Sequence, residues 1–206
     1  MTDPHLIRSL SELRGIIGDT HPQAKMKVHD HLDGFAESYI AKSPFLILST
    51  ADAEGNVDAS PKGDAPGFVQ VADQKTLIVP DRPGNKLAFG HENILSNPKV
   101  GLLFMIPGTP ETLRINGTAE LTADPALLAS LSARNKPAVL AIRVQVDEYF
   151  FHCAKAFIRS ELWQPDRWQA RHRVSFGDMY RKWAGVDEAA AQGLDQAIAA
   201  DYENNL

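Results

Sequence analysis

The sequence predicts a mainly β protein, an antiparallel barrel with inserted and terminal helices. Three observations point to this fold class. Between residues 45 and 163, six or so short runs are rich in apolar and β-branched side chains, as strands are. Turn residues separate most of these runs by loops of hairpin length, so consecutive strands are expected to pair antiparallel. The intervening helical patterns are short, which favours a barrel over a parallel sheet with crossover helices.

Two helical patterns precede the strands. In residues 3–18 apolar side chains recur at helical spacing, and residues 22–43 repeat the pattern. The second pattern contains His29 and His31, which suggest a metal site at first sight. Two helical residues at that spacing point apart, so no shared metal ion is expected.

The predicted strands follow in order. The first is FLILST, and a Gly-Asn turn connects it to a second strand that prolines interrupt. In sequence order the strands are expected at residues 45–50, 57–71, 75–80, 99–108, 111–122 and 138–153, and the run at 155–163 is expected to continue the last of them. In the strand at 111–122, Leu113 and Ile115 are expected to face the core because side chains alternate along a strand.

Helices are predicted between and after these strands. One spans residues 85–96, and a second spans 124–134, where Asp124 caps the helix and Pro125 fits its first turn. The tail after residue 166 is Ala-rich and helical. We therefore expect one domain over residues 1–206, with a barrel core at 41–165, N-terminal helices at 1–40 and a C-terminal helical tail at 166–206.

Composition narrows the functional classes. The 206 residues carry 26 acidic and 21 basic side chains, a net charge of −5, which argues against a general nucleic-acid binder. The N-terminal residues lack the apolar core of a signal peptide, and no stretch is long and apolar enough to span a membrane. The only cysteine, Cys153, is expected to be a buried small side chain in a reducing compartment. These features predict a cytoplasmic protein.

The segment DRPGNK, residues 81–86, is the first candidate site. It lies between a predicted strand and a predicted helix and places Arg82, Asn85 and Lys86 at the helix start. Free backbone N–H groups and the helix dipole favour an anion there, and Arg and Lys bind phosphate well. A solvated turn with ordinary surface cations remains the alternative.

Polar side chains on other predicted strands give weaker signals. Ser60 and Lys62 lie on the strand that prolines interrupt, which indicates either a sheet edge or a bend around a ligand. Thr112 and Arg114 share one strand face, which faces either solvent or a polar pocket. Cationic and aromatic side chains gather after residue 151, at His152, Lys155, Arg159 and Trp163. No nucleophile-elbow, Walker, dinucleotide-binding or paired-cysteine motif occurs, so the sequence does not support a hydrolase, NTPase, nicotinamide-binding or zinc site.

Taken in order, these segments resemble one family. SPKGD, PDRPGN, TLRINGTA and HCAKAFIRSELW, with the strands around them, resemble the FMN-binding split barrel of the pyridoxamine 5′-phosphate oxidase-like proteins, and are most similar to a bacterial FMN-dependent subgroup. The resemblance covers residues 41–165. Each motif alone is weak, whereas the ordered set is specific.

The resemblance implies a homodimer with FMN at the subunit interface. It assigns the FMN phosphate to Arg82, Asn85 and Lys86, and it places Ser60 and Lys62 beside the ring and ribityl chain. It further implies that Val79 and Pro80 contact the ring through their backbone groups, and that Thr112 and Arg114 contact the cofactor from the next strand. The C-terminal segment is implied to reach the neighbouring subunit's flavin through His152, Lys155, Arg159 and Trp163.

The resemblance implies a flavin-dependent oxidoreductase acting on an unidentified small molecule, with a small-molecule electron donor or acceptor. Pyridoxamine phosphate oxidases carry an Arg and, five residues later, a Lys on the second strand, where this chain has Ser60 and Ala65. Their C-terminal Arg-x-His segment also has no counterpart here, so oxidation of vitamin B6 is not expected. A non-catalytic flavin-storage or flavin-sensing protein, and a split barrel that binds deazaflavin F420 or haem, remain alternatives.

Overall fold

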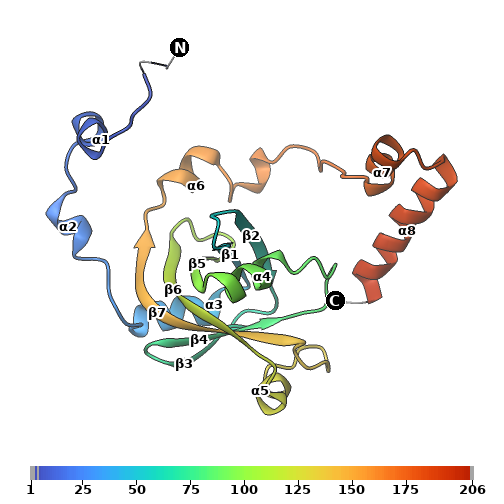
Figure 1. Ribbon diagram of the computed structural model, residues 1–206, viewed down its shortest axis with the longest axis horizontal. Helices are drawn as coiled ribbons and strands as arrows, with labels where there is room; N and C mark the ends of the chain where they lie inside the picture. Colours follow the sequence, from blue (N-terminus) through green and yellow to red (C-terminus); the bar gives the residue numbers. More distant parts are fainter. Residues whose placement is uncertain (1–2, 4, 205–206) are drawn as a thin grey trace.

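The computed structural model describes residues 3 and 5–204, and within them the chain forms one seven-stranded antiparallel sheet in the order β2-β1-β5-β6-β7-β4-β3. The sheet curls without closing, and β2 and β3 are its two edges (Figure 1). This arrangement confirms the predicted antiparallel, mainly β architecture and fits a split barrel. The strands are β1 (Phe45–Ala51), β2 (Val57–Gly63), β3 (Gln70–Asp73), β4 (Thr76–Asp81), β5 (Lys99–Met105), β6 (Thr112–Thr122) and β7 (Leu140–His152).

Helices surround the sheet and extend from both ends of it. Figure 1 shows α4 in front of β1, β2 and β5, with α1 and α2 on one side of the sheet and α7 and α8 on the other. The helices are α1 (Leu10–Ile17), α2 (Pro22–Lys25), α3 (Gly34–Lys42), α4 (Phe89–Ser96), α5 (Pro125–Ser130), α6 (Lys155–Ser160), the 3₁₀ turn η1 (Pro165–Arg167), α7 (Phe176–Ala184) and α8 (Glu188–Asn204). As predicted, the Asp124 carboxylate caps α5 by accepting from the Leu127 N–H at 2.9 Å.

The core fills the inner face of the curled sheet. Alternate residues of β1, β5 and β6 point inward, among them the fully buried Phe104, Leu113 and Ile115, as strand geometry requires. Helix α3 adds Ala36 and Ile40 to the same cluster. The remaining members are Leu32, Leu46, Leu48, Val69, Leu77, Val79, Ile94, Val100, Leu102, Ala119, Ile142, Val144, Val146 and Tyr149.

The outer face of the same strands is also apolar. Ile47 pairs with Leu103, Leu103 with Arg114, and Arg114 with Phe150, so these four side chains form one row across β1, β5, β6 and β7. The three apolar members of the row are half-buried, as is Phe45.

The interrupted strand predicted at residues 57–71 is instead two strands at opposite ends of the sheet. β2 pairs with β1, whereas β3 pairs with β4. Between them the chain turns at Asp64, whose N–H donates to the Pro44 carbonyl, and at Gly67, whose φ of 82° favours glycine.

The second predicted helix, at residues 22–43, is also interrupted. His29 exchanges two backbone hydrogen bonds with Tyr149 of β7, at 3.0 and 2.8 Å, and the Leu32 N–H donates to the Gln74 carbonyl at 2.7 Å. These sheet-like bonds replace helical bonds, so α2 and α3 are separate helices. The assumption that His29 and His31 share a helix was therefore wrong. The described residues contain no group of three or more His, Cys, Asp or Glu side chains able to hold a metal ion.

The segment after β7 differs from the expected strand continuation. Residues 155–160 form α6, and the chain leaves the sheet at Cys153. Cys153 is exposed, which corrects the prediction that it is buried. Its thiol accepts a hydrogen bond from the Lys155 backbone N–H, and this bond, with the nearby charges of Lys155 and Lys27, lowers the pKa of the thiol.

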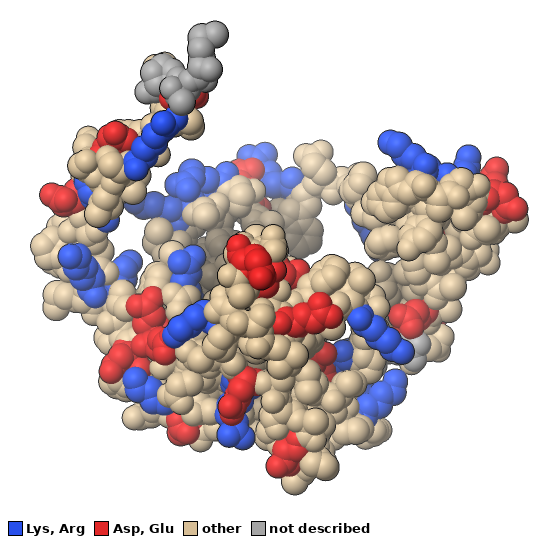
Figure 2. Space-filling view, in the orientation of Figure 1, with Lys and Arg blue, Asp and Glu red and all other residues tan. Residues whose placement is uncertain are grey.

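Charged side chains of both signs are mixed over the visible face of the sheet, and the α1–α2 segment stands off the body of the molecule (Figure 2). None of the helices among the described residues has the length and apolar character required to cross a membrane.

Candidate functional site

A cavity of about 870 Å³ lies where the curled sheet stays open. Its walls come from β2, from the end of β4, from the loop and helix α4 that follow it, and from Val139 and Leu140. Among the residues predicted from the sequence, it brings together Ser60, Lys62, Pro80, Arg82, Asn85 and Lys86. Residues from two strands that are distant in the sheet thus meet at one site.

The free edge of β4 forms one wall. β4 pairs with β7 on one side over its whole length, whereas β3 covers only its first half on the other. Beyond Ile78 this second edge is therefore open, and Pro80, which has no N–H to donate, lies there. Pro80 lines the cavity, whereas the side chain of Val79 is buried in the core and only its backbone remains to serve a ligand.

The loop after β4 has the backbone conformation that places its polar groups around the cavity. Lys86 and Ala88 adopt positive φ values of 63° and 55°, and the Asn85 side-chain oxygen accepts from the Leu87 N–H at 3.1 Å. Helix α4 then packs closely on β2 at Gly90, where an added Cβ would lie 3.3 Å from the Asp58 carboxylate and 3.4 Å from the Ser60 hydroxyl. Glycine at this position allows the helix to approach the strand.

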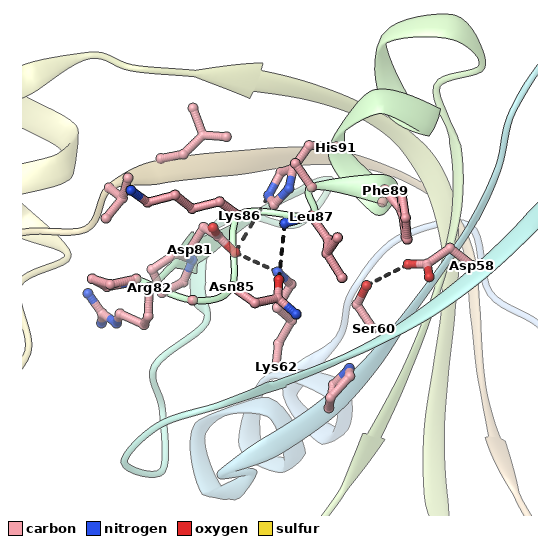
Figure 3. A pocket seen from close by; sticks show the side chains of 18 of the residues that line it. Asp58, Ser60, Lys62, Asp81, Arg82, Asn85, Lys86, Leu87, Phe89 and His91 are labelled. Atoms are coloured by element: carbon pink, nitrogen blue, oxygen red, sulfur yellow. Dashed lines mark hydrogen bonds and ion pairs between the residues drawn. The ribbon is translucent and has the colours of Figure 1, made fainter. Parts of the chain in front are cut away.

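An ion pair spans the opening of the barrel. Figure 3 shows Lys62 on β2 and Asp81 at the end of β4 pointing toward one another, and their Nζ and Oδ1 atoms are 2.5 Å apart. Four strands separate β2 from β4 in the sheet order, so this contact joins the two halves of the barrel. The Nε2 atom of His91 on α4 lies 3.5 Å from the same carboxylate oxygen, so the imidazole is a second partner of Asp81.

The lowered pKa of the Asp81 carboxyl makes the stability of the fold depend on pH. Burial raises its pKa, but hydrogen bonds and charges from His91 and Lys62 outweigh burial and hold the pKa below the ordinary value. A carboxyl whose pKa is lower in the folded than in the unfolded state stabilises the fold at pH values above its unfolded pKa of about 3.9. This stabilisation is lost as the pH falls through the pKa of the folded state.

We therefore expect Asp81→Asn to lower the melting temperature at pH 6 and to lower it progressively less as the pH falls below about 4. Thermal unfolding of both proteins between pH 6 and 3 measures this difference. A difference that stays constant across that range would show that ionised Asp81 contributes nothing to stability.

A second ion pair lies beside the first. Arg82 donates from Nε to the Asp64 carboxylate and from Nη1 to the Leu131 carbonyl, both at 2.8 Å. Asp64 follows β2 and Arg82 follows β4, so this pair also joins the two halves. Arg82 lines the cavity, and among the described residues only its Nε and Nη1 atoms have hydrogen-bond partners, which leaves Nη2 for a ligand.

Lys86 differs from both of these cations. It is exposed and lines the cavity, and within the part of the chain that the structure describes it has no hydrogen-bond or ion-pair partner. The site therefore holds a cation, next to the Asn85 amide, whose charge none of the described residues neutralises.

The other predicted residues lie outside this cavity, at the junction of β6, β7 and α6. Thr112 is buried and pairs with His152 of β7, whose buried Nε2 has no hydrogen-bond partner among residues 3 and 5–204. Burial, with the charges of Arg114 and Lys27, lowers the pKa of His152. Arg114 is exposed and lies over the Phe150 ring, 5.5 Å from its centre. Of the remaining three, Lys155 and Arg159 are exposed on α6, and the Trp163 Nε1–H donates to the Thr109 carbonyl at 2.9 Å.

Sequence reasoning missed part of the first site. Asp81 belongs to the DRPGNK segment but is not an expected ligand of an anion, and its partner Lys62 is distant in the chain. His91 lies in the first turn of α4, directly after Gly90. Its position in the chain close to the DRPGNK segment is the signal that could have identified it.

Comparisons with known proteins agree with this architecture. The family model described as pyridoxamine 5′-phosphate oxidase matches residues 32–153, a range that includes all seven strands. None of the curated protein sequences compared with the chain matches it.

Several solved structures resemble the chain at low identity. HupZ from Group A Streptococcus is 20% identical, with 58% of this chain and 93% of that chain covered and a TM-score of 0.47. A putative pyridoxamine 5′-phosphate oxidase from Lactobacillus delbrueckii is 24% identical, and the match covers 59% of this chain and 95% of that chain with a TM-score of 0.46. An FMN-binding protein from Syntrophomonas wolfei is 10% identical, and the match covers 70% of this chain and 97% of that chain with a TM-score of 0.43.

Proposed function

Because the chain belongs to the pyridoxamine 5′-phosphate oxidase family of split-barrel proteins, we propose that it is an FMN-binding flavoprotein that acts as an oxidoreductase on a small molecule. The observation that carries this proposal is the cavity in the open side of the barrel, which combines an unpartnered cation with apolar walls. Its volume of about 870 Å³ lies within the range of cofactor sites, about 300–1,000 Å³.

The loop after β4 would hold the FMN phosphate. Lys86 supplies an uncompensated positive charge, Asn85 an amide, and Arg82 the donors left on its guanidinium. A phosphate needs several charge-assisted donors, and charged groups without protein partners bind it at the least cost. These properties of the three side chains fit a phosphate.

The walls of the cavity fit the rest of the cofactor. Phe68, Leu87 and Phe89 offer apolar surface for a planar ring, while Ser60 and Lys62 place polar atoms on the β2 side. The open backbone edge of β4 at Val79 and Pro80 supplies further hydrogen-bonding groups. FMN, when bound, supplies the electron-transfer chemistry; the chain binds and orients it and excludes water from it. Lys62, held by Asp81, keeps a positive charge at a fixed place in this wall.

A second copy of the chain would complete the site. The apolar row on the outer face of β1, β5 and β7 is a surface suited to a homodimer, and the cluster at His152 lies at its edge. The Nε2 atom of His152, which has no hydrogen-bond partner among the described residues, and the exposed Arg114 are polar groups that the second subunit's flavin would contact. Thr112, Lys155, Arg159 and Trp163 belong to the same proposed contact.

The substrate is proposed only as a small molecule, with a small electron donor or acceptor. Vitamin B6 oxidation is not proposed, because Ser60 and Ala65 replace the cationic residues of those oxidases. We also propose that the chain is one domain with its barrel core at residues 41–165, and that it acts in the cytoplasm, where its one cysteine would stay reduced.

The visible absorption spectrum of the purified protein, followed by mass analysis of the released cofactor, tests the proposal. A flavin spectrum and the mass of FMN are expected. Release of haem or of deazaflavin F420 would contradict FMN while keeping a cofactor role for the barrel. A colourless protein that also fails to bind added FMN would contradict a flavin role altogether. Fast reduction of bound FMN by small donors would support catalysis, whereas resistance to all of them would favour a storage or sensing protein.

A further inference from the structure

Helix α1 presents an apolar face that none of the described residues buries. None of its eight residues, all of which the structure describes, is buried. Leu10, Leu13 and Ile17 recur at helical spacing on one face, and Leu10 is 68% exposed. An isolated helix of this length is unstable in water, so its apolar face requires a partner surface.

The α7–α8 hairpin at the other end of the chain has a second uncovered apolar face. The two helices pack tightly at Gly177, where an added Cβ would lie 2.1 Å from the Ala191 carbonyl oxygen. This packing leaves Phe176, Tyr180 and Trp183 on the outside of α7, and Trp183 is 68% exposed. Their spacing of four and three residues places them on one helical face.

The two surfaces are complementary in charge. Residues 5–28, the N-terminal arm, carry four cationic side chains (Arg8, Arg14, Lys25 and Lys27) and two carboxylates. The α7–α8 hairpin, residues 176–204, carries six carboxylates, four of them on α8, and two cationic side chains, Arg181 and Lys182. Opposite charges on surfaces that also present apolar residues favour a mutual contact.

One chain cannot bring these surfaces together in the observed arrangement. Figure 1 shows α1 and α7–α8 on opposite sides of the sheet. In a two-fold symmetric dimer, by contrast, a surface of one copy meets a different surface of the other, and the contact occurs twice.

The root of the arm lies at the surface where the second copy would bind. The backbone bonds between His29 and Tyr149 fix the arm to β7, next to Phe150 of the apolar row on the outer sheet face. An arm that starts there extends directly from the edge of the proposed dimer contact.

We propose that the N-terminal arm of one copy packs against the α7–α8 hairpin of a second copy, with the Leu10, Leu13 and Ile17 face on the Phe176, Tyr180 and Trp183 face. The partner is thus a second copy of this chain. The proposal rests on the homodimer in the proposed function and adds two exchanged contacts to it.

Disulfide trapping tests the exchange. Leu13→Cys and Tyr180→Cys are placed on two differently tagged, co-expressed full-length chains, both carrying Cys153→Ser so that no other thiol is present. Under mild oxidation we expect a disulfide between the two chains that forms at least tenfold faster than in the matched pair with Val57→Cys in place of Tyr180→Cys. Val57 is 84% exposed, is the first residue of β2 and belongs to neither surface.

Two results would overturn the exchange. One is equal trapping in the test and control pairs. The other comes from a chain that carries both cysteines. If its disulfide closes within that chain, so that a non-reducing gel shows a monomer, the arm folds back on its own hairpin.

Flavin absorbance of the same samples separates the two proposals. Bound FMN without trapping overturns the exchange alone, whereas trapping without FMN overturns the cofactor alone. Leu10→Glu adds a second measure, because it is expected to raise the dissociation constant of the dimer at least tenfold and to leave the melting of the barrel unchanged. An unaltered dissociation constant would also overturn the exchange.

Discussion

Replacing Lys62 with methionine is expected to lower the free energy of unfolding by about 3 kcal/mol, measured by urea denaturation without added FMN. Methionine keeps an unbranched apolar stem but removes the ammonium that faces Asp81. The side chains of Lys62 and Asp81 are only 16% and 17% exposed, so the carboxylate would be left largely dehydrated with His91 as its remaining partner. Removing one partner of a buried pair costs about 3–5 kcal/mol, and the residual exposure places this pair at the lower end.

Lys99→Met is the matched control. Lys99 pairs with Asp147 at 2.8 Å, but their side chains are 65% and 47% exposed. Water screens such a pair, and its loss is expected to cost about 1 kcal/mol or less. Equal losses in the two variants would mean that the Lys62–Asp81 pair does not hold the two halves of the barrel together.

Replacing Arg82 with alanine is expected to weaken FMN binding by about 1.5–3 kcal/mol, a factor of roughly 10–150 in the dissociation constant. The variant loses a guanidinium that belongs to the lining of the cavity. It also frees Asp64 and the Leu131 carbonyl, which hold the loop in place, so the melting temperature is expected to fall as well. Fluorescence titration with FMN, at a temperature where both proteins are folded, gives the two dissociation constants.

Arg143→Ala is the control for this variant. Arg143 is an exposed arginine on β7 that lies 3.7 Å from Glu120 and does not line the cavity. Its loss is expected to change FMN affinity less than twofold. Full flavin occupancy in Arg82→Ala, with only a lower melting temperature, would restrict Arg82 to holding the loop.

The local parts of the fold follow from the sequence. The alternation of Leu113 and Ile115 with polar neighbours predicted the core face of β6, and both are fully buried. Asp124 and Pro125 predicted the start of α5 because capping depends on adjacent residues alone. Such features need no knowledge of distant contacts.

The errors occur where distant contacts decide the structure. Residues 26–33 have helical periodicity, yet His29 bonds to Tyr149, more than a hundred residues later, and the helix is lost. The four residues of β3 join β4 rather than extend β2, because the two-residue turn at 74–75 folds the chain back as a hairpin.

The candidate site divides in the same way. Arg82, Asn85 and Lys86 were identified because they are adjacent in the chain and precede a helix. The Lys62–Asp81 and Arg82–Asp64 pairs were not, since both join β2 to β4 across the open side of the barrel. The sequence shows which cations are present, and only the fold shows that Lys86 has no partner in the described part of the chain.

The relative affinity for FMN and riboflavin tests the central claim most directly, because the two differ only in the phosphate. If the loop after β4 binds that phosphate, the wild-type protein binds FMN more tightly than riboflavin. Lys86→Ala is then expected to reduce this preference about tenfold. Lys42→Ala, at the exposed end of α3, is expected to leave it unchanged. Equal affinity of the wild-type protein for FMN and riboflavin, or a preference that Lys86→Ala does not alter, would contradict the account.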